Sequence, residues 1–211
     1  GIGHEFFHAA IHTAIDIGII TTVIALGAST GGTEATLAVL KQLPADIPGM
    51  VITQHMPEGF TAMYAQRLNK LCQMEVREAK NGDQIRPGLV LIAPGSQQME
   101  VVRSANGGYA VRCFSGQKVS GHMPSVDVLF RSVAKNVVGN KIGIIMTGMG
   151  KDGAEGLLEM RKKGAFTIGQ DKASCVVYGM PMVAYNIGAV SIQAGCEQIP
   201  SVLLNHLKKS S

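Results

Sequence analysis

Short apolar runs alternate with amphipathic helical patterns along most of this chain, and this alternation limits the folds open to it more than any other feature. Each of the runs VIALG, MVITQ and KIGIIMTG is followed by a helix-like stretch, in order EATLAVLKQL, FTAMYAQRLNKL and AEGLLEMRKKG. Apolar strands separated by amphipathic helices are typical of βαβ units, whose parallel sheet is covered on both faces. We therefore predict a doubly wound α/β fold with a mainly parallel sheet and helices on both faces.

The pattern changes between residues 75 and 114. Here the runs LVLIAP, MEVVRS and YAVRCF are separated by Pro-Gly and Asn-Gly-Gly turns. Such turns between apolar runs favour hairpins, so we expect an antiparallel hairpin region added to the sheet.

The length of 211 residues and the 46% apolar content suit one large domain, which we assign to residues 22–211. Residues 1–21 do not continue the strand and helix pattern, and they hold three of the six histidines. We expect this stretch to be a linker or an expression-derived segment.

Composition and charge argue against several classes of function. The 19 basic and 15 acidic residues are spread along the chain and aromatics are scarce, so we expect no nucleic-acid partner. No apolar run reaches the ~18–20 residues that span a bilayer, so we expect no direct membrane insertion. Four cysteines lie far apart without a CxxC pair, which favours a reducing, cytoplasmic location.

Three short segments follow the strands of the predicted parallel sheet, at the edge where such sheets bind ligands. They are GASTGG after VIAL, QHMP after MVIT, and TGMGKDG after KIGIIM. We therefore expect the functional residues to lie in these three segments.

The first segment contains G-x-S-x-G, from Gly27 to Gly31, with Ser29 at its centre. In this pattern the glycines allow a sharp turn between strand and helix that exposes the serine hydroxyl as a nucleophile. A phosphate-binding loop is the alternative, but Thr33 stands where that motif needs Lys. An ordinary serine turn also remains open.

Two His-Met-Pro triplets supply candidate bases, His55 and His122. His55 directly follows a predicted parallel strand, whereas His122 lies in a loop before a helix. We prefer His55 as the base because of that position.

The segment from Gly148 to Gly153 reads G-x-G-x-x-G, and Asp171 follows about 20 residues later, as in dinucleotide-binding folds. Only about 60 residues remain after it, and Rossmann domains usually carry this fingerprint on their first strand. Asp152 followed by Glu155 could alternatively cap the next helix.

HEFFH at residues 4–8 matches the zinc-peptidase pattern H-E-x-x-H, with His12 one turn further on. On a helix His4 and His12 would lie about 12 Å apart, so both cannot bind one zinc ion. The pattern also has no strand before it to form a cleft, and we predict no metal site from it.

Taken together, Ser29, His55 and Asp152 each follow a predicted parallel strand and would meet at one edge of the sheet. A nucleophile, a base and an orienting carboxylate are the parts needed for acyl transfer. The main rivals are a dinucleotide-binding oxidoreductase built on residues 148–153 and a non-catalytic interaction domain with a structural serine turn.

The chain resembles the catalytic domain of the chemotaxis protein-glutamate methylesterases. The resemblance rests on IALGASTGGTEA, QHMPEGFTAMYAQRL, LIAPG, PSVDVLF, MTGMGKDGAEG and DKASCVVYGMP. It implies a triad of Ser29, His55 and Asp152, an oxyanion hole from the backbone amides of Thr30 and Met149, and no metal or cofactor. It also implies that the chain removes methyl groups from glutamate methyl esters of methyl-accepting chemotaxis receptors, releasing methanol, and can deamidate receptor glutamines.

This chain differs from that family in two respects. Family members commonly carry His where this sequence has Gln98, which leaves the role of that position open. The regulatory receiver domain that the resemblance implies is absent from these 211 residues. The chain is either an excised domain or a protein without phosphorylation control.

Overall fold

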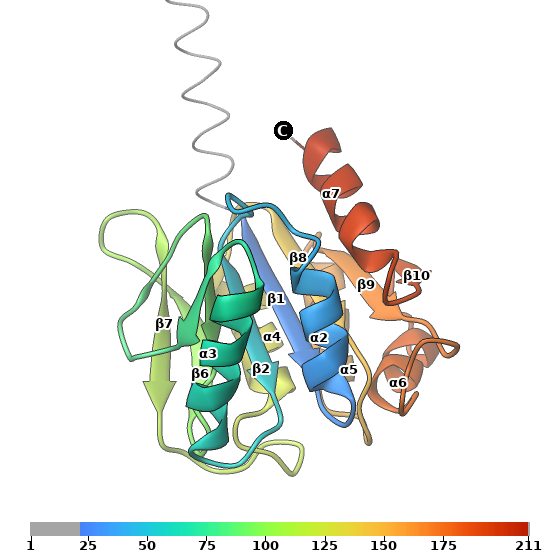
Figure 1. Cartoon of the computed structure of the whole chain (residues 1–211), viewed down its shortest axis with the longest axis horizontal. Helices are drawn as coiled ribbons and strands as arrows, with labels where there is room; N and C mark the ends of the chain where they lie inside the picture. The colour runs from blue at the N-terminus through green and yellow to red at the C-terminus, as the bar shows by residue number, and fades with distance from the viewer. Residues whose placement is uncertain (1–21, 211) are drawn as a thin grey trace, which may run out of the picture.

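In a computed structural model, which describes residues 22–210, seven parallel strands form a central sheet (Figure 1). Their order across the sheet is β10-β9-β8-β1-β2-β5-β3. The strands are β1 (Val23–Ala28), β2 (Met50–Gln54), β3 (Glu75–Glu78), β5 (Leu89–Ile92), β8 (Lys141–Ile145), β9 (Phe166–Gln170) and β10 (Ile192–Ala194).

Helices cover both faces of this sheet, because the strands are apolar on both sides. Along β1, Val23 and Ala25 point into one core, while Ile24 and Leu26 point into the other. The second core is covered by α2 (Gly32–Leu40), α3 (Phe60–Leu71) and α7 (Ile199–Lys209), which lie in front of the strands in Figure 1. The first is covered by α4 (Val126–Asn136), α5 (Ala154–Lys162) and α6 (Met180–Asn186). The predicted doubly wound fold is confirmed.

A separate antiparallel sheet has the order β4-β7-β6. It comprises β4 (Gln84–Ile85), β6 (Gln98–Arg103) and β7 (Tyr109–Phe114). The predicted hairpin region is confirmed for MEVVRS and YAVRCF, which pair as β6 and β7. It was wrong for LVLIAP, because LVLI forms β5, a parallel strand between β2 and β3 of the main sheet. An uninterrupted apolar strand buried on both faces fits a parallel sheet better than a hairpin.

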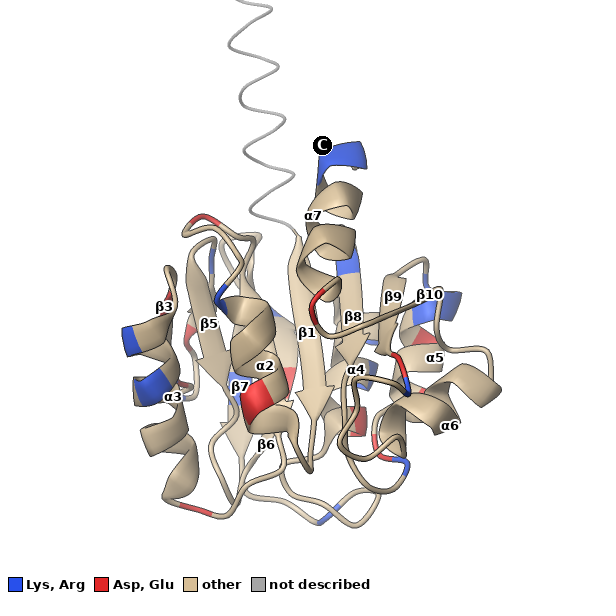
Figure 2. Ribbon diagram, turned by 45° about the vertical axis from the view of Figure 1, so that its right-hand side comes forward, with Lys and Arg blue, Asp and Glu red and all other residues tan. Residues whose placement is uncertain are grey.

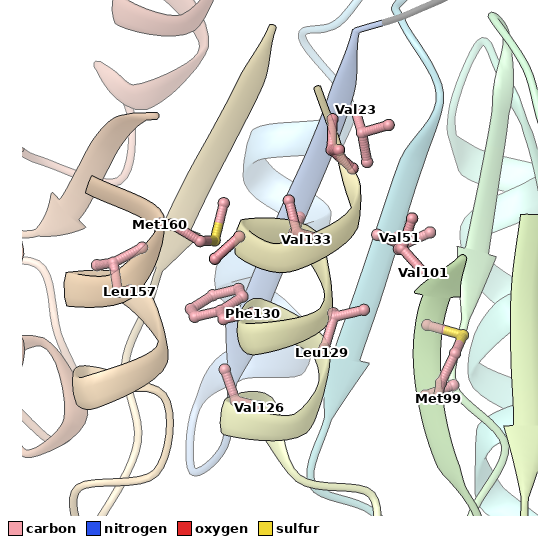
Figure 3. Close-up of a cluster of buried hydrophobic side chains, with 14 of the residues drawn as sticks. Val23, Val51, Met99, Val101, Val126, Leu129, Phe130, Val133, Leu157 and Met160 are labelled. Carbon is pink, nitrogen blue, oxygen red and sulfur yellow. The ribbon is translucent and has the colours of Figure 1, made fainter. Parts of the chain in front are cut away.

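Helix α4 is the element that joins the two sheets. Its Leu129, Phe130 and Val133 are fully buried, and Figure 3 shows them between β1, α5 and the antiparallel strands. The helix also approaches β1 closely, because a Cβ on Gly27 would lie 2.2 Å from Val126 Cγ1. A glycine in β1 therefore lets the first turn of α4 sit beside the end of the strand.

Charged residues lie mainly on helices and loops, and β1, β2 and β9 carry none (Figure 2). None of the helices within residues 22–210 combines the length and the apolar character needed to cross a membrane. Residues 1–21, with the HEFFH pattern, and Ser211 lie outside the described residues, so the proposed linker segment stays a prediction.

Candidate active site

The candidate site lies at the switch point of the sheet, where the strands that follow β1 lie on one side of it and the later strands on the other. β1 is paired with β2 on one side and with β8 on the other. Ligand sites of open parallel sheets form at the carboxyl ends of the strands beside such a switch point. The segments after β1, β2 and β8 carry Ser29, His55 and Asp152, so the topology brings all three to one edge.

Ser29 and His55 are neighbours because of strand register. Ala28 is the last residue of β1 and pairs with Gln54, the last residue of β2. The His55 amide still donates to the Ala28 carbonyl over 3.1 Å. Paired strands lie about 4.8 Å apart, so the next residues along, Ser29 and His55, are adjacent across the two strand ends.

The Ser29 turn is held against the segment that follows β8. The Ser29 amide donates to the Thr147 carbonyl over 2.9 Å, and the Thr147 hydroxyl donates to the Thr30 carbonyl over 2.9 Å. A Cβ on Gly148 would lie 2.7 Å from Ser29 Cβ, so only glycine allows this approach. Gly31, with φ of 80°, completes the turn in the left-handed region that favours glycine.

His55 and Asp152 form a short hydrogen bond, with 2.7 Å between His55 Nε2 and Asp152 Oδ2. The Asp152 side chain is fully buried, and the His55 side chain is 9% exposed. Of the three predicted residues, the structure thus joins these two directly.

The Asp152 carboxylate also lies at the start of α4. It accepts hydrogen bonds from the Ser125 hydroxyl and from the amides of Val126 and Asp127, over 2.8 to 2.9 Å. Burial alone raises the pKa of Asp152, but the bonds from His55, from the two amides and from Ser125 outweigh it. The pKa of Asp152 therefore lies below its usual value, and the group stays ionised at neutral pH.

Because Asp152 is ionised, its bond to His55 determines which ring nitrogen carries the proton. The carboxylate only accepts, so His55 Nε2 carries the hydrogen and Nδ1 is left as an acceptor. Nδ1 is buried and has no hydrogen-bond partner among residues 22–210. Within that range no hydrogen bond joins the Ser29 hydroxyl to His55, although catalytic bonds often tighten only when substrate is bound.

His122 stacks on the His55 ring, with ring centroids 3.7 Å apart and 11° between the planes. The second candidate base thus lies at the same site, although within residues 22–210 no hydrogen bond joins its ring to Asp152. Burial lowers the pKa of His122, and the charge of His55 acts in the same direction. Both rings line a cleft of about 230 Å³, together with Met56, Pro57, Lys118, Gly121, Met123 and Pro124.

Two backbone amides near Ser29 remain free. In residues 22–210, no group accepts a hydrogen bond from the amide nitrogen of Thr30 or of Met149. Thr30 follows Ser29 directly, and Met149 follows Gly148, whose backbone packs against Ser29. Both predicted oxyanion donors are therefore available, and Met149 is 66% exposed.

The structure gives little support to a dinucleotide-binding loop at residues 148–153 or to a helix cap at Asp152. Gly148 packs on Ser29 and Gly153 on Val126, so both glycines have packing roles that involve no nucleotide. Asp171 accepts hydrogen bonds from the amide and hydroxyl of Ser174. The helix-cap alternative for Asp152 is wrong, because Gly153 is the N-cap of α5 and the Asp152 carboxylate bonds to α4.

Gln98 points into the protein and is 1% exposed. Its Nε2 donates to the carbonyls of Gln117 and His122, and its Oε1 accepts from the Ser125 amide over 2.8 Å. Gln98 thus fixes the loop that carries His122 and the residue that caps α4. Sequence reasoning found the position but not this role.

Sequence reasoning also missed Gln54, Ser125 and Thr147, which hold the three candidate residues in place. Each acts through contacts with residues at least 25 positions away. The only sequence signal for Gln54 and Thr147 was their position, because each is the first residue of a segment that follows a predicted parallel strand.

A parallel α/β domain with a serine at one strand end and a buried His–Asp pair beside it has the architecture of a serine hydrolase. The family model for CheB methylesterase matches residues 24–203. The chain belongs to the CheB methylesterase family.

Several curated proteins are similar to this chain. The protein-glutamate methylesterase/protein-glutamine glutaminase 2 of Syntrophomonas wolfei is 61% identical over 171 residues, which are 81% of this chain and 50% of that protein. The protein of the same name from Hahella chejuensis is 55% identical over 183 residues, which are 87% of this chain and 50% of that protein. The chain therefore spans about half the length of these curated relatives.

A solved structure shows the same fold. The CheB methylesterase catalytic domain of Thermotoga maritima superposes with a TM-score of 0.84 at 33% sequence identity. The match covers 87% of this chain and 97% of that domain.

Proposed function

We propose that this chain is a serine hydrolase that removes methyl groups from glutamate methyl esters of methyl-accepting chemotaxis receptors. The observation that carries the proposal is the 2.7 Å bond from His55 to the buried Asp152, at the strand end next to Ser29. The family membership and the names of the relatives support the substrate.

In the first step His55 acts as base. Because Nε2 donates to Asp152, the proton of the Ser29 hydroxyl goes to Nδ1 as the serine oxygen attacks the ester carbonyl. The buried Asp152 carboxylate holds the ring and stabilises the imidazolium that forms.

The attack places negative charge on the former carbonyl oxygen. The free amides of Thr30 and Met149 are the groups that would bind it. When the tetrahedral intermediate collapses, the C–O bond to the methoxy group breaks and His55 returns its proton to the leaving oxygen. The products are methanol and an acyl-enzyme on Ser29.

Water then hydrolyses the acyl-enzyme with His55 again as base, which restores Ser29 and leaves a free glutamate. A glutamine side chain would enter the same sequence with ammonia as the leaving group, which accounts for deamidation. These steps need no metal or organic cofactor.

The partners we propose are the cytoplasmic helical regions of the receptors, which places the reaction in the cytoplasm. The family resemblance implies control by a receiver domain, and the curated relatives are about twice as long as the match. We propose no nucleic-acid partner.

The test is methanol release from methylated receptor by the wild type and by Ser29→Ala. Ala fits the turn but lacks the attacking oxygen, so we expect the rate to fall roughly 10⁶-fold, as when a serine protease loses its nucleophile. Ser201→Ala, which changes an exposed serine of α7, is the matched control and should keep the wild-type rate. Wild-type methanol release from folded Ser29→Ala would refute the proposal.

A further inference from the structure

Gln54 is a fully buried amide that the mechanism above does not use. It is the last residue of β2, is 2% exposed, and extends toward the Ser29 turn. Its Nε2 donates to the Ser29 carbonyl over 2.8 Å. Its Oε1 has no hydrogen-bond partner within residues 22–210.

An unpaired buried oxygen normally costs about 1–3 kcal/mol of stability, so a purely structural site would be better filled by an apolar side chain. The packing also leaves room for the amide beside the Ser29 turn. A Cβ on Gly32 would lie 2.3 Å from Gln54 Oε1, so a side chain at Gly32 would displace the amide. The donor end of Gln54 thus bonds to the Ser29 carbonyl in the space that Gly32 leaves, although no group in residues 22–210 bonds to its acceptor end.

The geometry of the peptide bond links this contact to the candidate oxyanion hole. The Ser29 carbonyl and the Thr30 N–H belong to one peptide unit. A trans peptide is planar, and its N–H points opposite to its C=O. A donor that fixes the Ser29 carbonyl on the β2 side therefore also fixes the direction of the Thr30 N–H on the other side.

We infer that Gln54 is a positioning residue that aims the Thr30 amide at the developing oxyanion, an inference that rests on the function proposed above. The Gly32 amide also donates to the Ser29 carbonyl, over 2.8 Å. That bond lies within the turn itself, whereas Gln54 anchors the turn to the rigid end of β2. Without Gln54 the peptide keeps a partner for its oxygen but loses its fixed direction.

The test compares Gln54→Met and Gln54→Leu with the wild type in methanol release from methylated receptor. Both variants remove the donor together with the unpaired oxygen, so the fold should be kept. Loss of one oxyanion donor costs about 10²–10³ in kcat. A Thr30 amide that points away from the oxyanion should lose part of that effect. We therefore expect kcat to fall roughly 10- to 100-fold, with KM within about twofold of wild type.

Thr53→Val is the matched control. Thr53 precedes Gln54 on β2, is fully buried and also carries an unpaired side-chain oxygen among the described residues. Its side chain points to the opposite face of the sheet. We expect Thr53→Val to keep the wild-type kcat and to be at least as stable.

Ser29→Ala, measured in parallel, separates the inference from the proposed function. If it retains activity, or if the wild type releases no methanol, the proposed function fails. If Ser29→Ala is inactive and either Gln54 variant keeps kcat within about threefold of wild type, the inference on Gln54 is overturned. Failure of both Gln54 variants to fold would overturn it as well, because the amide would then serve folding.

Discussion

Among single residues, the buried charge of Asp152 matters most for the proposed chemistry. Asp152 lies in the interior, and four donors surround it: His55, Ser125 and two amides of α4. A carboxylate with several such bonds stays ionised, and helix N-termini favour negative charge. Asp152 can therefore hold the His55 ring in one tautomer without itself taking up the proton.

Asp152→Asn and Asp171→Ala distinguish the hydrolase from a dinucleotide site. The hydrolase interpretation predicts that Asp152→Asn lowers methanol release on the order of 10⁴-fold, because an amide no longer fixes the tautomer of His55. Within residues 22–210 the Asp171 carboxylate accepts hydrogen bonds only from Ser174, so Asp171→Ala should cost far less. Circular dichroism is the check that both variants fold. An impaired Asp171→Ala beside a fully active Asp152→Asn would contradict the triad.

At the scale of elements, sequence could predict what each strand end carries but not what surrounds it. Ser29, His55 and Asp152 were found because each stands after an apolar run. Ser125 and Gln98 were not given their roles, because their contacts to Asp152 and to each other span 27 positions of sequence. The run LVLI was assigned to the wrong kind of sheet, because the turn signals on either side of it were given more weight than its uninterrupted apolar character, which favours a parallel strand.

The approach of α4 to β1 gives a prediction at this scale. In Gly27→Ala the new Cβ would meet Val126, whose amide donates to Asp152. The start of α4 must move, so we expect the free energy of unfolding to fall by about 1–3 kcal/mol. We expect kcat to fall roughly 10- to 100-fold as well, because the carboxylate loses its alignment.

Denaturant unfolding and methanol release check this prediction. Val126→Ala removes the two methyl groups that the new Cβ would meet, so the double variant should lose less stability than the sum of the single variants. A difference of at least roughly 0.5 kcal/mol is expected. Strictly additive losses would show that the contact between β1 and α4 is not the cause.

In the whole molecule, the fold gathers charged and polar groups beyond the carboxyl ends of β1, β2 and β8, strands that are mainly apolar. Both faces of the sheet are covered by helices, and the site lies at the switch point between β1 and β8. The overall architecture followed from the alternation of runs along the chain. The chain covers about half the length of its curated relatives.

The buried carboxylate predicts how the stability of the fold depends on pH. The pKa of Asp152 is lower in the folded protein than in the unfolded chain, where it is about 3.9. Its ionisation therefore stabilises the fold above that value, and the contribution is lost as the pH falls through the folded pKa. We expect the wild type to lose more unfolding free energy than Asp152→Asn between pH 5 and pH 3, measured by urea denaturation. Equal losses would contradict the lowered pKa.

Labelling with a fluorophosphonate, followed by mapping of the adduct by mass spectrometry, tests the proposal that Ser29 is a nucleophile activated by His55. We predict one adduct, on the peptide that contains Ser29, absent in Ser29→Ala and formed at least about 100-fold more slowly in His55→Ala. His206→Ala, a change in α7 where this ring stacks on Phe166, should label at the wild-type rate. Methanol release without any adduct on Ser29, or undiminished labelling of Ser29→Ala, would contradict the claim.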